Sequence, residues 1–352
     1  MKDGKFGFGI IGCGVIGPWH ARAIKANTET ATLVAACDIL PDKLQKLRSE
    51  YGDNLAAYTD YYELLKNPNV DIVSICTPSG LHGEMAVAAA NAGKHILCEK
   101  PLEIDLGRLD RMIEAAEKNK VKLAGIFQRR TYQSSKKVKQ AIEAGELGKM
   151  ILGDAYMKYY RSQAYYDSAG WRGTRALDGG GALMNQGVHG IDLLLWLMGD
   201  VDSVYARSRT MVRDIEVEDT AVAMLQYKSG AMGIIEGTTS VNPGEATTIQ
   251  LHGKLGTIIY EESDVKRWAV ATGDDDRAKD ISAATEEEAA GGTADPKDIG
   301  VLGHIRHVAD LIEAIEEDRD PMVTGPGGRK AVEMILAIYK SSDENREIKL
   351  PL

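Results

Sequence analysis

The stretch GIIGCGVIGPWHA (residues 9–21) decides the fold class of this chain. It carries a GxGxxG pattern that follows an apolar run, predicted as a buried strand, and opens a predicted helix. A chain with 37 glycines produces such spacings by chance, but the strand–turn–helix context is what the mechanism requires. Gly12 permits a tight turn, Gly14 lets backbone N–H groups approach a pyrophosphate, and Gly17 lets helix and strand pack closely.

The same loop predicts a dinucleotide site. The helix that begins at Gly17 would direct its partial positive charge at the phosphates, with Val15 and Ile16 beside them. The next predicted strand ends at Asp38, whose carboxylate can accept hydrogen bonds from the adenosine ribose and would repel a 2′-phosphate. We therefore expect NAD, with NADP less favoured. The alternatives are a plain strand-to-helix turn for the loop and an ordinary helix cap for Asp38.

Apolar runs alternate with amphipathic helical segments through residue 127, which predicts a Rossmann-type doubly wound α/β domain with a parallel sheet over residues 1–127. Residues 128–352 combine a few helices with β-type segments broken at KSG (228–230) and GKLG (253–256). They predict an α+β domain with a large open, mainly antiparallel sheet for substrate binding and oligomerisation. The acidic segment at about 273–296 is predicted to be an exposed, mobile insertion.

Composition limits the partners. The net charge of −10 argues against nucleic acid or an anionic membrane as the main partner. The longest apolar run, LLLWLM (193–198), is too short to cross a bilayer, and the first residues lack the features of a signal peptide. We therefore expect a cytoplasmic protein with four reduced cysteines. These are interpreted as small buried hydrophobes at strand ends, the alternative being a catalytic thiol.

Two further predicted strands end in polar motifs, CTPSGLH (76–82) and EKP (99–101). Ligands of doubly wound sheets bind beyond the carboxyl ends of the strands, so both motifs should line the crevice beside a nicotinamide. Burial and a cationic nicotinamide would both favour the neutral form of Lys100, which can accept a hydroxyl proton. The alternative is a surface lysine at a strand end. The predicted cofactor contacts here are Thr77, Pro78, Ser79, His82, Glu99 and Lys100.

These motifs, together with GGGALMNQGVHGIDLL (179–194), resemble the glucose–fructose oxidoreductase/inositol dehydrogenase (Gfo/Idh/MocA) family over nearly the whole chain. The resemblance implies that Lys100 lies by the nicotinamide and the reacting hydroxyl, and that the peptide bond before Pro101 is cis. Members of this family are often dimers or tetramers. The expected open sheet in the second domain likewise favours a homodimer or homotetramer.

Asn185 and His189 lie four residues apart on a predicted helix and should therefore share one face, toward the substrate. Many family members carry Asp at the first of these positions. Asn185 cannot take a proton, so Lys100 and His189 remain as the proton carriers, with Asn185 positioning a hydroxyl or the imidazole. Asp192 could orient the ring of His189, or could instead be a solvated acid or a helix-terminal partner.

Weaker candidates lie between residues 127 and 174. Gln128 and Arg129 resemble family residues near the cofactor and substrate, and Trp171 and Arg172 resemble residues close to the nicotinamide. Aromatic faces suit sugar rings, and arginines can hold a phosphate or carboxylate; the alternative is a loop packing cluster. The predicted substrate residues are Lys100, Arg129, Tyr160, Arg161, Arg172, Asn185 and His189. The remaining histidines have no partner at metal-ligand spacing, so no metal is expected.

The sequence thus predicts an NAD-dependent oxidoreductase acting on a secondary hydroxyl carbon of a carbohydrate, polyol or sugar nucleotide. A second hypothesis is glycoside cleavage or elimination with recycled NAD. A third is a catalytically inactive protein that senses NAD. The presence of Lys100 and His189 argues against the third.

Overall fold

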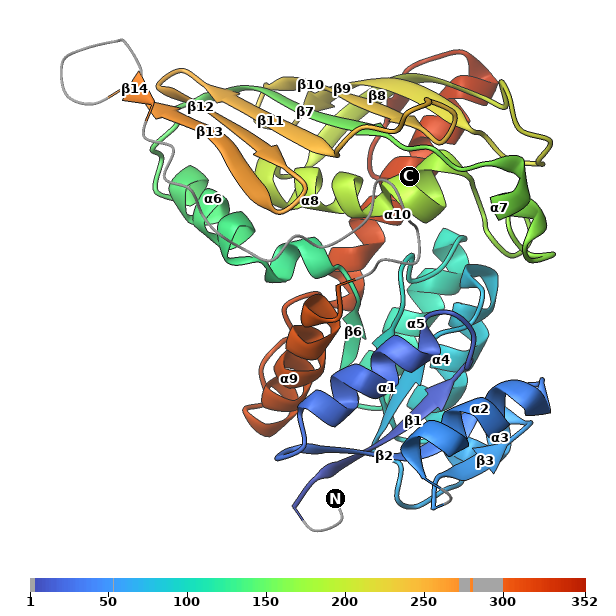
Figure 1. Cartoon of the computed structure of the whole chain (residues 1–352). Coiled ribbons are helices and arrows are strands. Elements are labelled where there is room, and N and C mark those ends of the chain that lie inside the picture. Colours follow the sequence, from blue (N-terminus) through green and yellow to red (C-terminus); the bar gives the residue numbers. More distant parts are fainter. Residues whose placement is uncertain (1–3, 53, 272–278, 281–299) are drawn as a thin grey trace. The chain divides into compact units, whose positions relative to one another are not determined.

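The chain forms two compact units in the computed structural model (Figure 1). The first unit comprises residues 1–128 and 301–329, and the second comprises residues 129–300 and 330–352. The structure describes residues 4–52, 54–271, 279–280 and 300–352. None of the helices in these ranges has the length and apolar character that crossing a membrane requires.

A six-stranded, wholly parallel sheet forms the centre of the first unit, in the order β3-β2-β1-β4-β5-β6. The strands are β1 (Phe6–Ile11), β2 (Ala31–Cys37), β3 (Ala56–Tyr58), β4 (Ile72–Ile75), β5 (His95–Cys98) and β6 (Leu123–Gly125). Every residue of β1 is buried, as expected for a strand covered on both faces. This order confirms the predicted doubly wound fold and places the topological switch point between β1 and β4. The three-residue β3 was not predicted.

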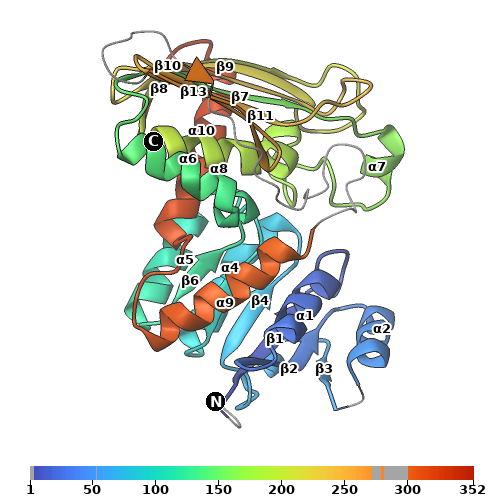
Figure 2. The same ribbon diagram turned by 60° about the vertical axis from the view of Figure 1, so that its left-hand side comes forward.

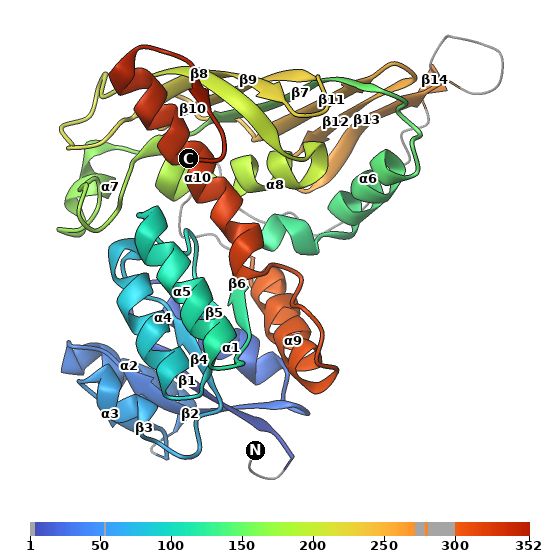
Figure 3. The ribbon, with the colours of Figure 1, turned by 180° about the vertical axis from the view of Figure 1, so that it is seen from behind.

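Helices cover both faces of this sheet. They are α1 (Gly17–Ala26), α2 (Pro41–Tyr51), α3 (Tyr61–Leu65), α4 (His82–Asn91), α5 (Leu106–Lys118) and α9 (Leu302–Glu316). Figure 2 shows α1 and α9 side by side over one face, and Figure 3 shows α4 and α5 over the other. Pro18 is the second residue of α1, and its missing N–H costs nothing in the first turn of a helix.

The predicted domain boundary needs a correction at α9. The sequence predicts a second domain over residues 128–352, whereas residues 301–329 pack with the first unit. α9 contributes Val308, Leu311 and Ile312 to the same core cluster as Phe8 and Ile24, and all five are at most 1% exposed. Burying each such side chain stabilises the fold by roughly 1.5–3 kcal/mol, which explains why α9 belongs to this core.

A nine-stranded sheet forms the second unit, in the order β14-β13-β12-β11-β7-β10-β9-β8-β15. Its strands are β7 (Met150–Lys158), β8 (Val201–Arg209), β9 (Thr220–Tyr227), β10 (Met232–Thr238), β11 (Thr248–Gly253), β12 (Gly256–Glu261), β13 (Asp264–Val270), β14 (Lys279–Asp280) and β15 (Ile348–Lys349). Only the β7–β10 pairing is parallel among those described, which confirms the predicted mainly antiparallel sheet. Apart from β14, the predicted acidic insertion lies outside the described residues.

Helices gather on one face of this sheet (Figure 1). They are α6 (Gln133–Glu143), α7 (Gln163–Asp167), α8 (Val188–Met198) and the C-terminal part of α10 (Gly325–Glu344). Residues of β9 alternate between buried and exposed, so one side of the strand meets the core. The other side exposes an apolar face made of Leu152, Val222, Met224, Met232 and Ile234.

Candidate active site

The glycine loop has the geometry that its sequence predicts. Gly12 has a φ of +95°, and a Cβ atom there would lie 2.7 Å from the carbonyl of Cys76. At Gly17 a Cβ atom would lie 2.4 Å from the carbonyl oxygen of Gly12. At Gly14 it would meet, among the described residues, only Nζ of Lys43 at 3.9 Å. The backbone is therefore open where a pyrophosphate must approach, and Lys43, which was not among the predicted cofactor residues, adds a positive group.

Val15 and Ile16 complete the loop between Gly14 and α1. Val15 is 56% exposed, and Ile16 is the residue before the first turn of the helix, with no side-chain capping hydrogen bond. The first N–H groups of a helix lack intrahelical partners and can donate to an anion. The loop and the start of α1 thus fit the pyrophosphate of a dinucleotide.

Asp38 follows β2 and faces the glycine loop. Its Oδ2 accepts a hydrogen bond from the backbone N–H of Cys13 at 2.8 Å, and its Oδ1 accepts one from the N–H of Leu40 at 2.9 Å. A carboxylate has about four acceptor positions, so these two bonds leave room for ribose hydroxyls. Asp38 therefore holds the loop in place, and its contact with the ribose stays a prediction.

The motif at residues 76–82 forms a loop and a short 3₁₀ turn, Ser79–Leu81, after β4. His82 is buried, and its Nδ1 and Nε2 lie 2.8 and 2.9 Å from the carbonyl oxygens of Pro101 and Thr77. The ring thus connects this loop to the EKP segment. Ser79 is also buried, whereas Thr77 and Pro78 are partly exposed. The protein contacts of His82 indicate that it positions the loops; a direct cofactor contact is untested.

The EKP segment directly follows β5. Lys100 is partly exposed, and the Lys100–Pro101 peptide bond is cis, as the resemblance implied. The carboxylate of Glu99 is buried and accepts hydrogen bonds from His20 and His304, at 2.9 and 3.0 Å. In the sequence, neither histidine has a partner at metal-ligand spacing. Both lie far from Glu99 in the chain, and no local pattern could have revealed the contact.

Four cysteines lie near these strand ends, and all are buried free thiols, as predicted. Burial raises the pKa of Cys13 and of Cys37 to about 12, with Asp38 adding to both shifts. It also raises the pKa of Cys76 and Cys98 well above the usual value. A thiol is nucleophilic as the thiolate, so these shifts argue against the alternative of a catalytic cysteine.

Gln128 and Arg129 follow β6 and have different surroundings. Gln128 is buried, and its side chain packs against Gly303, where a Cβ atom would lie only 2.5 Å away. Arg129 donates to a carboxylate oxygen of Glu262 at 2.7 Å, and Glu262 is the main influence that raises the pKa of Arg129 against burial. This ion pair engages the guanidinium that was predicted to bind substrate.

The second unit gathers two of its predicted arginines in one aromatic cluster. Arg161 is 3% exposed and donates to Oε1 of Gln186 at 2.8 Å. The guanidinium of Arg172 lies 4.3 Å from the ring of Tyr165 and 4.5 Å from that of Trp171, measured to the ring centroids. Tyr165 is shared, because Arg161 lies 5.7 Å from the same ring. Tyr165 and Gln186 join the site, and sequence reasoning missed both.

Tyr160, also predicted to bind substrate, follows the end of β7 at Lys158. It is partly exposed and forms an isolated bridge with Ser240. The guanidinium of Arg213 lies 5.3 Å from the centroid of its ring. Its side chain therefore has protein contacts of its own, and substrate binding there stays a prediction.

Asn185 lies in a π-helical turn, Ala182–Gly187, that leads into α8, so the expected uniform α-helix is wrong at this point. Nδ2 of Asn185 donates to Oδ1 of the buried Asp178 at 2.5 Å, and its Oδ1 accepts from Gln186 at 2.8 Å. An acid therefore lies beside the position where many family members carry one. His189 lies in the first turn of α8 and is partly exposed.

The surroundings of Asp192 differ from both alternatives that the sequence offered, a solvated acid and a helix-terminal partner. It is 1% exposed, and its carboxylate accepts hydrogen bonds from Nε and Nη2 of Arg130 at 2.8 and 2.5 Å. It is therefore neither a solvated acid nor a helix-terminal residue. The bidentate ion pair joins α8 to the segment before α6.

The predicted residues fall into two groups, one in each unit. The glycine loop, Asp38, Thr77–His82 and Glu99–Pro101 surround the carboxyl ends of the parallel strands of the first unit. The aromatic cluster, Asn185 and His189 belong to the second unit. The cooperation of Lys100 with His189 stays a prediction.

The structure sharpens the expected result of changing Asn185 to Asp. The new carboxyl group would face the carboxyl group of Asp178, and the two would share a proton. The charge that this pair gains above the pKa of the shared proton would stabilise an imidazolium at His189. We expect the acidic limb of the profile of kcat/KM against pH to move upward by roughly one pH unit, with NAD binding retained. The variant Asn185→Ala is the control: it removes the amide without adding a carboxyl group, so a shift of the profile caused by charge should be absent from it. Superimposable profiles for Asn185→Asp and the wild type would make Asn185 a packing residue.

Comparisons with known proteins match both units. The family model described as "Oxidoreductase family, NAD-binding Rossmann fold" matches residues 6–127, and the model described as "GFO/IDH/MocA C-terminal domain" matches residues 135–259. The chain is 31% identical to the myo-inositol 2-dehydrogenase of Thermotoga maritima, over 97% of this chain and 98% of that protein. It is 28% identical to the levoglucosan dehydrogenase of Pseudarthrobacter phenanthrenivorans, over 76% and 77% of the two chains.

A solved structure agrees with these matches. The WlbA dehydrogenase from Bordetella pertussis, in complex with NADH and UDP-GlcNAcA, aligns with a TM-score of 0.87 at 33% identity and covers 99% of each chain. The comparisons confirm the predicted fold class, the NAD cofactor and the oxidoreductase class.

Proposed function

We propose that this chain, which belongs to the Gfo/Idh/MocA family of NAD-binding oxidoreductases, acts on a secondary hydroxyl of a carbohydrate, polyol or sugar nucleotide. The observation that carries the proposal is Lys100, partly exposed and directly after β5, at the edge where a doubly wound sheet binds its ligand. The named relatives, which include inositol and levoglucosan dehydrogenases, support this substrate class. Bound NAD supplies the hydride acceptor or donor.

Lys100 is the proposed proton relay. In its neutral form Nζ accepts the proton of the hydroxyl that is oxidised, and in its charged form it holds the oxygen of a carbonyl. The hydrogen bonds of Glu99 and His82 fix the loops on either side of it, which would limit the directions that Nζ can take. His189 is the proposed second proton carrier, and Asn185 orients an adjacent hydroxyl.

The aromatic cluster of the second unit favours a substrate that carries a carboxylate or phosphate. Burial lowers the pKa of Arg161, and the tyrosines around it oppose the shift. An anion beside Arg161 and Arg172 would stabilise both cations, and the rings of Tyr165 and Trp171 offer apolar faces to a sugar. The bound UDP-GlcNAcA of the WlbA dehydrogenase is a ligand of this kind.

The test is a panel of neutral polyols, anhydrosugars and sugar nucleotides, with and without a uronic carboxylate, incubated with NAD⁺ while NADH absorbance is followed. The proposal predicts NADH that accumulates with at least one of them. If a product forms but NADH does not accumulate, the enzyme regenerates its NAD⁺ in each cycle, which would indicate glycoside cleavage or elimination instead. NAD binding with no turnover of any compound would favour the NAD-sensing alternative.

We also propose that the exposed apolar face of the nine-stranded sheet joins copies of the chain into a homodimer or homotetramer. Five apolar residues of β7, β9 and β10 are at least 36% exposed there, and a contiguous apolar patch of this kind marks a protein interface. Sedimentation equilibrium should give two or four times the chain mass of 38.2 kDa. A single-chain mass across micromolar concentrations would contradict the proposal.

We also propose that the protein is located in the reducing environment of the cytoplasm. The four buried free thiols support it, because such thiols persist where disulfides are kept reduced.

A further inference from the structure

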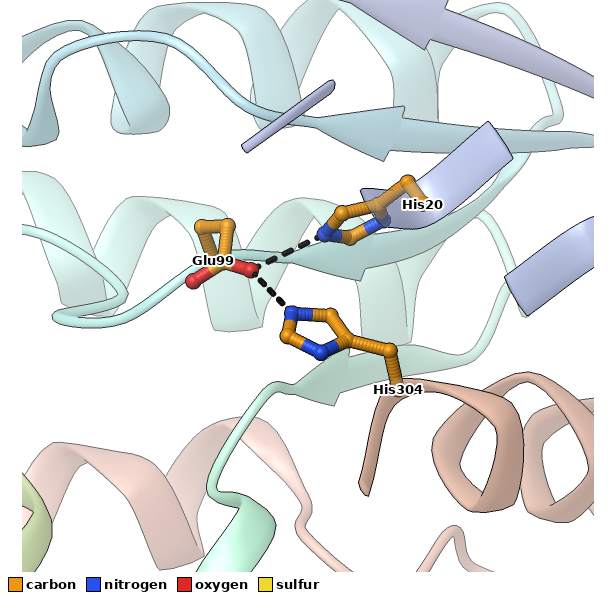
Figure 4. A group of neighbouring side chains, drawn as sticks. All are labelled: His20, Glu99 and His304. Atoms are coloured by element: carbon orange, nitrogen blue, oxygen red, sulfur yellow. Dashed lines mark hydrogen bonds and ion pairs between the residues drawn. The ribbon is translucent and has the colours of Figure 1, made fainter. Parts of the chain in front are cut away.

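A carboxylate held between two imidazoles lies inside the first unit (Figure 4). His20 comes from α1, His304 from α9 and Glu99 from the end of β5, and their exposed fractions are 0%, 0% and 5%. Nε2 of each histidine lies within 3.0 Å of the same oxygen, Oε1 of Glu99. The two rings meet edge to face, with their centroids 5.1 Å apart.

The hydrogen bonds define the protonation of this cluster. A carboxylate oxygen can only accept, so both Nε2 atoms carry a hydrogen. Each Nδ1 is buried and has no hydrogen-bond partner among the described residues. A charged imidazole would therefore leave a buried N–H donor unsatisfied, whereas a neutral ring leaves only a lone pair. With both rings in this form, the cluster is one anion between two donors.

The pKa of Glu99 agrees with an ionised carboxylate. Burial alone would raise this pKa, but the hydrogen bonds and the Coulombic attraction of His20 and His304 outweigh burial and hold it well below its usual range. Burial lowers the pKa of His20, although Glu99 opposes the shift.

The same three side chains could also ligate a metal ion, since zinc binds two histidines and a carboxylate. The N–O distances of 2.9 and 3.0 Å are ordinary hydrogen-bond lengths. Histidines that bind a metal almost always donate their second ring N–H to a protein group or water, and no such partner exists here among the described residues. The geometry favours the hydrogen-bonded anion.

The anion lies at the ligand-binding edge of the sheet. The N–H of Glu99 donates to the carbonyl of Ile75 at 3.0 Å, which continues the pairing of β5 with β4. Oε2 accepts from the N–H of Lys100 at 3.2 Å. Because ligands of such sheets bind beyond the carboxyl ends near the switch point, the negative charge is fixed close to the place of the nicotinamide.

We propose that Glu99, held by His20 and His304, makes the first unit bind oxidised nicotinamide in preference to reduced nicotinamide. The oxidised ring carries a positive charge and the reduced ring carries none, so a fixed buried anion stabilises only the former. His20 and His304 are positioning residues, because they keep the carboxylate charged and in place. The inference rests on NAD binding by this unit and goes beyond the proposed roles of Lys100 and His189.

Glu99→Gln tests the proposal directly. Both imidazoles donate to one oxygen, so the amide oxygen of the variant can keep both hydrogen bonds while the charge is lost. Dissociation constants of NAD⁺ and NADH are measured separately by calorimetry on the full chain without substrate. The ratio of the NAD⁺ constant to the NADH constant should rise roughly three- to tenfold, as for unit charges about 8 Å apart at an intermediate dielectric.

Two control variants separate the effect of losing the charge from a change of side-chain shape and from a general loss of stability. Glu99→Asp keeps the charge and should retain most of the wild-type ratio. Glu103→Gln removes another buried carboxylate, which pairs with Arg108 at 3.1 Å, and should leave the ratio within about twofold. If Glu99→Gln does not fold, Glu99→Met takes its place.

An unchanged ratio in the folded charge-free variant overturns the proposal, as does an equal weakening of both forms. Failure of the wild type to bind either form would instead remove the NAD assignment on which the proposal rests.

Discussion

Replacing Lys100 with methionine is expected to lower kcat by roughly 10²–10⁴-fold, the usual loss when a positioned acid–base group is removed. The affinity for NAD⁺ should change little, because the predicted pyrophosphate and ribose contacts lie at the glycine loop and at Asp38. Methionine keeps most of the length and apolar stem of lysine. The measurement is steady-state turnover with a substrate from the panel, together with NAD⁺ titration of the same protein.

Lys66→Met is the matched control for Lys100→Met. Lys66 lies in the same unit, is exposed and pairs with Glu63 at 2.6 Å, so its loss should leave turnover intact. Near-normal turnover of Lys100→Met would show that Lys100 is not the relay, and His189 would then have to carry the proton alone. A loss of NAD⁺ affinity that matches the loss of turnover would point to a cofactor-binding role instead.

Local patterns were enough to predict the doubly wound parallel sheet of the first unit and the motifs that follow its strands. The glycine loop, Asp38 and EKP each lie at the end of a buried apolar run, and such runs read directly as parallel strands. The chain order of these motifs then places them at one edge of the sheet. The cis bond before Pro101 followed from the family resemblance, and the structure confirms it.

The partners of the site residues could not be predicted, because they come from distant parts of the chain. Glu99 meets His20 across 79 positions and His304 across 205, and neither spacing has a local signature. The return of α9 to the first unit is the reason that His304 arrives there. The same holds for Arg129 with Glu262, 133 positions apart.

The π-helical turn before α8 shows a different limit. A spacing of four residues in a helical pattern predicts one shared face, and the sequence carries no mark that the first turn is wider. The side-chain amide of Asn185 donates to Asp178, which lies in the loop before the helix, and accepts a hydrogen bond from the neighbouring Gln186. That residue 185 is Asn shows that its side chain carries no charge, but the contacts of this side chain depend on the surrounding backbone.

Asp192→Asn is expected to lower the free energy of unfolding by roughly 3–5 kcal/mol, because it leaves the buried guanidinium of Arg130 without its counter-ion. The two side chains are 1% and 7% exposed. Burial raises the pKa of Asp192 although Arg130 opposes the shift, so desolvation offsets much of the attraction within the pair. The expected cost therefore comes from the buried guanidinium that loses this carboxylate. Chemical denaturation of the full chain measures it, with the exposed pair of Asp202 and Lys349 as control: Asp202→Asn should change stability little.

The double variant Arg130→Met/Asp192→Leu separates the two contributions. Removing both charges avoids an uncompensated buried ion, so much of the stability lost in Asp192→Asn should return, as for other buried pairs replaced by apolar residues. The alternative that Asp192 orients His189 makes the opposite forecast: Asp192→Asn would lose turnover and keep its stability. The bidentate geometry with Arg130 favours the first outcome, since both carboxylate oxygens are already engaged. A stable Asp192→Asn variant with impaired turnover would return Asp192 to the list of groups that act on His189.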